Sequence, residues 1–126
     1  MSSTSVRPAP SHHLVEAITE AVQRLKAENL VVIELQECAA LASTMMICEG
    51  DNTTHTRAIA EAVIRHLRSM RIRPSLTEGL EEGRWILVDY FDVCLHVMVP
   101  QLREYYDLES LWTHTRKKRT EAARPL

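Results

Sequence analysis

The stretch EGLEEGRWILVDYFDVCLHVMVPQLREYYDLESLW, residues 78–112, decides the fold of this chain. Two apolar runs at 85–88 and 93–99 flank a short polar break, which is the pattern of a β-hairpin or of two sequential strands with a tight connection. Pro100 ends the second run, because proline donates no hydrogen bond to a sheet. Aromatic and leucine residues then recur at helical spacing as far as Trp112. The segment therefore predicts strand, turn, strand and helix.

Side chains alternate between the two faces of each predicted strand, and the two faces differ in chemistry. One face is purely aliphatic and is the predicted core face. The other carries Trp85, His96 and Met98. This second face is either a half-exposed surface for a partner, to which methionine and tryptophan are well suited, or a second core layer beneath a helix.

The sequence upstream of the hairpin shows the same two periodicities. An amphipathic pattern capped by Ser11 predicts a helix over about 12–28, with Asn29 as its stop. A run rich in β-branched residues predicts a buried strand at 30–35. The segment 36–44 fits either one helical turn or a tight connection. The remaining predictions are a strand at 45–48, a helix from the capping residues 51–54 to about 71, and a short edge strand near 75–77.

These elements predict an α/β (α+β) domain, in which helices flank a mixed sheet of four to five strands. We expect three regions: a disordered N-terminal tail at 1–11, the folded domain at 12–114, and a basic C-terminal tail at 115–126. The whole chain has 126 residues, which suits one domain.

Composition excludes several classes of protein. No apolar run approaches the roughly 20 residues that a membrane span needs. The N-terminus lacks the apolar core of a secretory signal, so we expect a cytoplasmic protein. The three cysteines form no Cys-x-x-Cys pair, which argues against a disulfide framework and against a zinc site. Cys48 and Cys94 lie in apolar runs and are predicted to be buried thiols.

Charge is unevenly distributed along the chain. Residues 116–126 hold five basic side chains and one acidic, whereas residues 1–115 hold ten basic and sixteen acidic. An acidic body is a poor match to a protein that clamps duplex nucleic acid with its main face, and it suits a basic protein as partner. The basic tail is either free to touch phosphate groups or a solvated, disordered end.

The segment 78–112 resembles the C-terminal half of the ribosomal silencing factors, also called Iojap-like proteins. Trp85–Asp89 matches the Trp-apolar-apolar-apolar-Asp strand of that family, and Leu95–Val97 matches its apolar-His-Val strand. Arg103–Trp112 matches its Arg-x-x-Tyr-x-Leu-Glu-x-Leu-Trp helix. The resemblance covers about residues 12–114.

The likeness is weaker in Gly50–Ala60, and four positions depart from the family pattern. Ser43 or Thr44 stands where an aspartate is common before the second strand. Thr54 stands where arginine is usual, and Glu49 where threonine is usual. Phe91 stands in the hairpin where glycine is usual, so it must avoid the positive φ that glycine tolerates or accept strain.

The resemblance implies a fold similar to that of nucleotidyltransferases and a function in binding rather than catalysis. Family members bind the large ribosomal subunit through ribosomal protein number fourteen on its subunit-joining face. They sterically block the small subunit and so silence translation, with no cofactor and no metal. The signature surface and its support are expected to be Trp85, Asp89, His96, Arg103, Tyr106, Glu109 and Trp112.

Two alternatives remain open: a metal-dependent nucleotidyltransferase, and a dimeric scaffold with no ribosomal role. The transferase needs Asp-x-Asp on one strand, whereas this chain offers Asp89 and Asp92 across a turn. A metal held by Asp89, Asp92 and His96 is disfavoured, because in a regular strand the last two lie about 13 Å apart. The two aspartates are more simply explained by hydrogen bonds to the turn backbone.

Three further features concern partners. Given the resemblance, the phosphates that the basic tail at 115–126 could touch, in a minor contact, are those of ribosomal RNA. The aliphatic edge of the hairpin could pair with a second copy, so a homodimer off the ribosome is plausible. His55, near a helix start, either binds an anion or partner or hydrogen-bonds the helix start.

Overall fold

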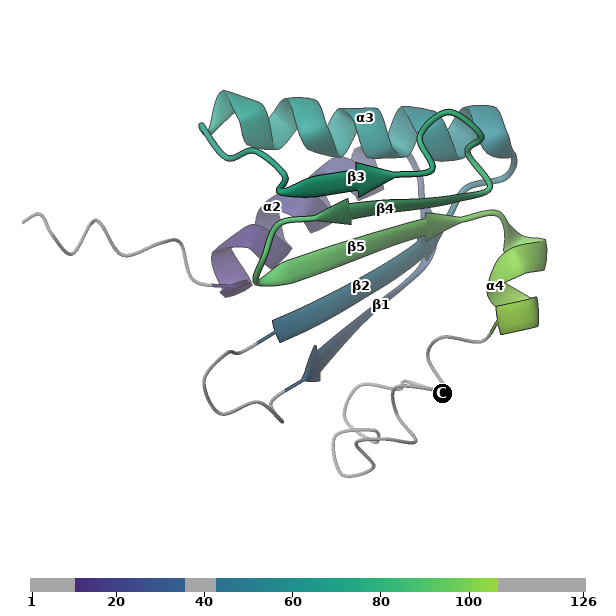
Figure 1. Cartoon of the computed structure of the whole chain (residues 1–126), viewed down its shortest axis with the longest axis horizontal. Coiled ribbons are helices and arrows are strands. Elements are labelled where there is room, and N and C mark those ends of the chain that lie inside the picture. Colours follow the sequence, from purple (N-terminus) through teal and green to yellow (C-terminus); the bar gives the residue numbers. More distant parts are fainter. Residues whose placement is uncertain (1–10, 36–42, 107–126) are drawn as a thin grey trace, which may run out of the picture.

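Figure 1 shows the computed structural model of the chain, which describes residues 11–35 and 43–106. Helices cover one face of a twisted sheet, and a short helix lies at one end of it. The described elements are α2 (Ser11–Arg24), β1 (Glu28–Leu35), β2 (Ser43–Glu49), α3 (Thr53–Ser69), β3 (Leu76–Glu78), β4 (Trp85–Asp89), β5 (Val93–Met98) and α4 (Pro100–Tyr106).

The predicted hairpin and mixed sheet are confirmed. β4 and β5 pair antiparallel, with Trp85 opposite Met98 and Asp89 opposite Cys94. The sheet has five strands in the order β1-β2-β5-β4-β3. The central pair, β2 and β5, is parallel, whereas the β1–β2 and β3–β4 pairs are antiparallel. A parallel pair needs a long crossover, which here consists of α3, β3 and β4.

The strand order of the sheet corrects two predictions. We expected it to offer a free aliphatic edge, but β4 and β5 each have a neighbour on both sides. In the described sheet the edges are β1 and β3. The hairpin strands cannot pair with a second copy, because β2 already pairs with β5 and β3 already pairs with β4. The strand predicted to be buried at 30–35 is itself an edge, and Leu30 and Val32 on it are only half-buried.

The main core lies between the sheet and the two long helices. As predicted, the aliphatic face of the hairpin belongs to it: Ile86, Val88, Val93, Leu95 and Val97 are fully buried. α2 and α3 pack on this face of the sheet (Figure 1). They contribute Ile18, Val22, Ile59, Val63 and Leu67, which recur at helical spacing.

The two long helices end earlier than predicted, and for the same reason. α2 ends at Arg24 rather than near 28, because Lys26 adopts a left-handed conformation with φ 62°. Lys26 N–H then donates to Gln23 O at 2.9 Å and Ala27 N–H to Val22 O at 3.0 Å, the Schellman pattern. At the end of α3, Arg71 has φ 67° and makes the equivalent turn. No glycine marks either stop, so sequence reasoning placed both too late.

Asn29 is also not a helix stop. It lies inside β1 with φ 52°, at the irregular register between Glu28 and Val31. Asparagine tolerates this left-handed conformation better than most residues, which explains its presence at a bulge.

The helices of residues 11–35 and 43–106 include none with the length and apolar character that a membrane span requires.

Candidate functional site

The face of the sheet opposite α2 and α3 carries the predicted signature residues. Residues paired directly across strands share a face, so Ile47, His96 and Leu87 form one row across β2, β5 and β4. Met98 and Trp85 form the next row. Trp85, Leu87 and His96 are half-buried. We call this surface the open face.

The open face has its own small apolar cluster. Ile33, Met45, Ile47 and Met98 are buried there. Val31, Trp85 and Leu102 pack against them, and Leu102 brings in α4. The sequence left two options for this face, a partner surface or a second core layer. The described residues show features of both, because a buried cluster on β1, β2 and β5 adjoins half-buried Trp85, Leu87 and His96.

Trp85 and His96 form a polar pair on this face. The Trp85 indole Nε1–H donates to His96 Nδ1 over 3.0 Å. An indole nitrogen only donates, so Nδ1 must keep its lone pair and the histidine proton sits on Nε2. Nε2 lies 3.7 Å from Cys94 Sγ. Burial lowers the pKa of His96 from 6.5 to about 4, and the Asp89 carboxylate opposes that shift. His96 is therefore neutral at physiological pH.

Asp89 organises the hairpin turn. Its Oδ1 accepts a hydrogen bond from Phe91 N–H at 2.9 Å, and its main-chain oxygen accepts from Ser75 N–H at 2.7 Å. This aspartate therefore satisfies turn backbone, as one of the sequence interpretations proposed. Phe91 has φ 81°, so of the two options that its sequence position allowed, strain is the one it takes.

Arg103 joins α4 to the end of β2 and to the start of β1. It is 7% exposed, and its guanidinium lies 3.4 Å from Glu49 Oε2 at the end of β2. It also donates to the main-chain oxygen of Asn29. Asn29 Nδ2 in turn donates to Glu49 Oε1 at 3.1 Å. These three residues, here called the α4 clamp, tie β1, β2 and α4 together.

Sequence reasoning singled out Arg103 but missed its two partners. Glu49 was noted only as a departure from the family pattern. Glu49 directly follows the apolar run at 45–48, and a carboxylate next to a buried strand needs a cation or hydrogen-bond donors close by. That position was the signal from which a basic partner could have been predicted. Of the remaining predicted site residues, Tyr106 is the last residue of α4. The Tyr106 side chain, Glu109 and Trp112 lie outside the described part of the chain.

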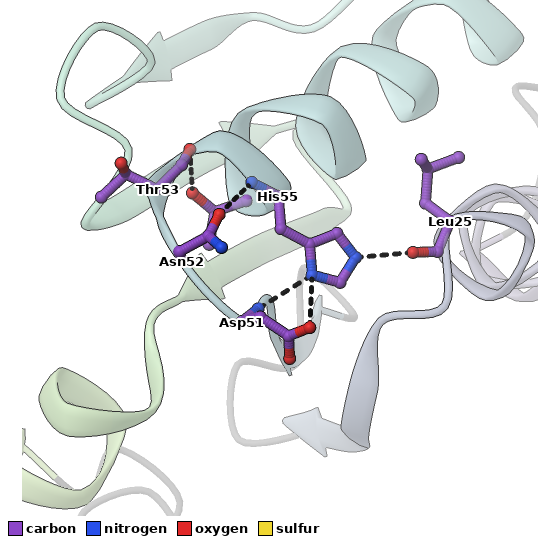
Figure 2. A network of polar contacts seen from close by, with 6 residues as sticks. Leu25, Asp51, Asn52, Thr53 and His55 are labelled. Carbon is purple, nitrogen blue, oxygen red and sulfur yellow. Dashed lines mark hydrogen bonds and ion pairs between the residues drawn. The ribbon is translucent and has the colours of Figure 1, made fainter.

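The loop between β2 and α3 forms a second polar network (Figure 2). Asn52 caps α3 by accepting from His55 N–H at 2.9 Å. His55 Nδ1 accepts from Asp51 N–H at 2.8 Å, and Nε2 lies 2.7 Å from Leu25 O at the end of α2. Both ring nitrogens of His55 are thus engaged within the protein. His55 joins the two helices and leaves no nitrogen for an anion.

Gly50 allows the tight approach of this loop to α3. A Cβ added there would lie 2.8 Å from Thr56 Cγ2 and 2.9 Å from Thr56 N. We therefore expect Gly50→Ala to lower the free energy of unfolding by about 2 kcal/mol, because it overpacks a fixed backbone. Urea unfolding followed by circular dichroism measures this. Adding Thr56→Ser to the Gly50→Ala variant removes the Thr56 methyl group, but the new Cβ still clashes with the Thr56 backbone nitrogen. The double variant should therefore not regain stability.

The described residues offer little for catalysis. They hold no group of three or more His, Cys, Asp or Glu side chains placed to bind a metal ion. Burial raises the pKa of Cys48 and of Cys94 to about 12, so both are protonated and poor nucleophiles at neutral pH. His55, His96 and Asp89 each serve a structural contact. What this arrangement offers instead is a half-buried surface that carries the hydrogen-bonded Trp85–His96 pair.

Comparison with known proteins identifies relatives of this chain. The profile of the family described as "Ribosomal silencing factor during starvation" matches residues 8–125. The ribosomal silencing factor of Chromobacterium violaceum is 34% identical over 93 residues, which cover 74% of this chain and 76% of that protein. A mouse protein named for mitochondrial assembly of the ribosomal large subunit is 24% identical over 116 residues, covering 86% of this chain and 51% of its own length.

A solved structure shows the same fold. The crystal structure of a protein from Chromobacterium violaceum superposes with a TM-score of 0.77 at 30% identity. The match covers 82% of this chain and 87% of that one.

Proposed function

Because this chain belongs to the ribosomal silencing factor family, we propose that it binds the large ribosomal subunit and keeps the small subunit from joining. In this proposal the contact is ribosomal protein number fourteen on the subunit-joining face. The chain acts sterically in the cytoplasm and represses translation. One small domain suffices for this, since it only has to occupy a surface that the joined ribosome needs.

The observation that carries the proposal is the open face. α2 and α3 cover the other side of the sheet, whereas on this side Trp85, Leu87 and His96 are half-buried. The Trp85–His96 hydrogen bond holds both rings in place before any partner arrives. Tryptophan held rigidly in a half-buried position is a frequent hot spot of protein interfaces. His96 is neutral, so docking on this face would not bury an unpaired imidazolium.

Two further facts support a protein partner on the large subunit. Residues 1–115 hold ten basic and sixteen acidic side chains, which complements a basic ribosomal protein. A relative carries the ribosomal large subunit in its name. The nucleotidyltransferase alternative has less support, because Asp51 follows Gly50 in the loop where that chemistry needs a phosphate-binding turn.

The direct test is sedimentation with separated ribosomal subunits. The purified chain is mixed with large or small subunits, pelleted, and then joining is started with magnesium. We expect the chain to pellet with the large subunit alone and to lower the yield of joined ribosomes in proportion to its occupancy. If it pellets with neither subunit and joining proceeds normally, the proposal is wrong.

Trp85→Ala tests the open face as the docking surface. We expect its affinity for the large subunit to fall about tenfold or more, because a rigid indole at an interface centre is lost. Met70→Gln provides a matched control, since Met70 is a 40% exposed apolar side chain at the end of α3, off the open face. Far-UV circular dichroism must show both variants folded. Equal binding by Trp85→Ala would place the interface elsewhere.

A further inference from the structure

Phe91 is the most exposed large apolar side chain in the described part of the chain. It is 81% exposed, against 45% for Leu76 and 40% for Met70. Its backbone has φ 81°, in the left-handed region that an aromatic residue rarely adopts. The ring therefore gains nothing from burial while its backbone carries strain.

Hydrogen bonds within the turn fix the backbone around Phe91, so the turn itself holds the Phe91 side chain in its exposed position. Asp89 Oδ1 accepts from Phe91 N–H at 2.9 Å. Tyr90 N–H donates to Val93 O at 2.8 Å, and Asp92 N–H donates to Tyr90 O at 2.9 Å. The Tyr90 ring, 5% exposed, packs in the main core. One aromatic of the turn thus anchors it while the next is presented to solvent.

Strain that the surrounding structure enforces is concentrated at functional sites, including ligand clamps. Here the enforcing contacts are the Asp89 cap and the buried Tyr90. A turn selected only for stability would place glycine at this φ, because glycine adopts it without a steric penalty. A large apolar side chain at such a position is explained by what the side chain does outside the fold.

The surroundings of Phe91 define the partner chemistry. Asp89 and Asp92 flank it in the sequence, and both are partly exposed. Leu76, opposite Asp89 in the β3–β4 register, adds a second exposed apolar side chain on β3. An exposed phenylalanine with carboxylates on both sides is complementary to an apolar pocket that has lysine or arginine at its rim. Carboxylates would repel the phosphates of RNA, which argues against a stacked nucleobase as the target.

We propose that Phe91 is a docking anchor that inserts into a basic-rimmed apolar pocket of a ribosomal protein on the large subunit. This inference rests on the function proposed above, and it adds a contact at the hairpin tip to those of the open face. The rigid turn makes the anchor effective, because little conformational freedom is lost when it docks.

The test uses two substitutions that keep the turn conformation and remove the ring. Phe91→Gly and Phe91→Asn both suit a left-handed φ. We expect their melting temperatures to equal or exceed that of the unaltered chain, while their dissociation constants for the large subunit rise about tenfold. A purely structural residue would not lower affinity while preserving stability. Met70→Gln is the matched control and should change neither quantity.

Asp92→Asn separates the two kinds of partner. A basic protein pocket predicts weaker binding and a shallower dependence of affinity on salt. Tighter binding by Asp92→Asn would indicate RNA and overturn the protein assignment. If the unaltered chain binds the large subunit and both Phe91 variants bind it equally well, the anchor is wrong and the proposed function stands. If the unaltered chain does not bind, both proposals fail.

Discussion

Replacing Arg103 with methionine is expected to lower the free energy of unfolding by about 3–5 kcal/mol, the usual effect of breaking a buried ion pair. Arg103 is 7% exposed and its partner Glu49 is 15% exposed. Methionine fills similar volume but donates no hydrogen bond. The Glu49 carboxylate and the main-chain oxygen of Asn29 then lose the cation that faces them. Because the clamp joins β1, β2 and α4, its loss should also release α4 from the sheet.

Urea unfolding of the variant measures this effect, and hydrogen exchange of the α4 amides localises it. A double variant, Arg103→Met with Glu49→Leu, is the informative control. Removing both charges leaves no isolated carboxylate, so the double variant should recover much of the lost stability. If Arg103→Met alone unfolds at the same urea concentration as the unaltered chain, the clamp contributes nothing to the fold.

The second large effect is a loss of stability in acid that depends on His96. In the folded chain the pKa of His96 is lowered from 6.5 to about 4. Well above pH 6.5 the imidazole is neutral in both the folded and the unfolded state, and this contribution to stability is complete. As pH falls from about 6.5 to about 4, the unfolded chain takes up a proton that the folded chain refuses. This proton uptake lowers the free energy of unfolding by roughly 3 kcal/mol, at about 1.4 kcal/mol for each unit of difference between the two pKa values.

His96→Asn isolates this effect, because asparagine can accept from the Trp85 indole but does not titrate. Its unfolding free energy should fall less between pH 6.5 and 4 than that of the unaltered chain, by roughly 3 kcal/mol. The imidazole resonances of His96, followed by NMR, should titrate with a midpoint near 4. Parallel pH profiles for the two proteins would show that His96 is more solvated than its burial implies.

The candidate site was only partly predictable from the sequence. Alternation placed Trp85 and His96 on one face of the hairpin, because that follows from the strand period alone. Their hydrogen bond depends on the register, which pairs Leu87 with His96 and leaves Trp85 a diagonal neighbour. Arg103 was found as part of a motif, but its role depends on Glu49 and Asn29, which are distant in the chain.

The sequence by itself determined the local elements of this protein. Apolar runs at 85–88 and 93–99 specified two strands, Pro100 ended the second, and the stripe from Ile59 to Leu67 specified a helix. Each of these signals is carried by neighbouring residues. A period of two or of 3.6 can therefore be read without knowing what packs against it.

Only the tertiary structure decided how these elements meet. The sheet order, in which β2 lies parallel to β5, leaves the hairpin without a free edge. His55 meets Leu25 and Arg103 meets Asn29 across separations of 30 and 74 residues. Such contacts form between residues that the chain brings together only on folding, so no local pattern encodes them.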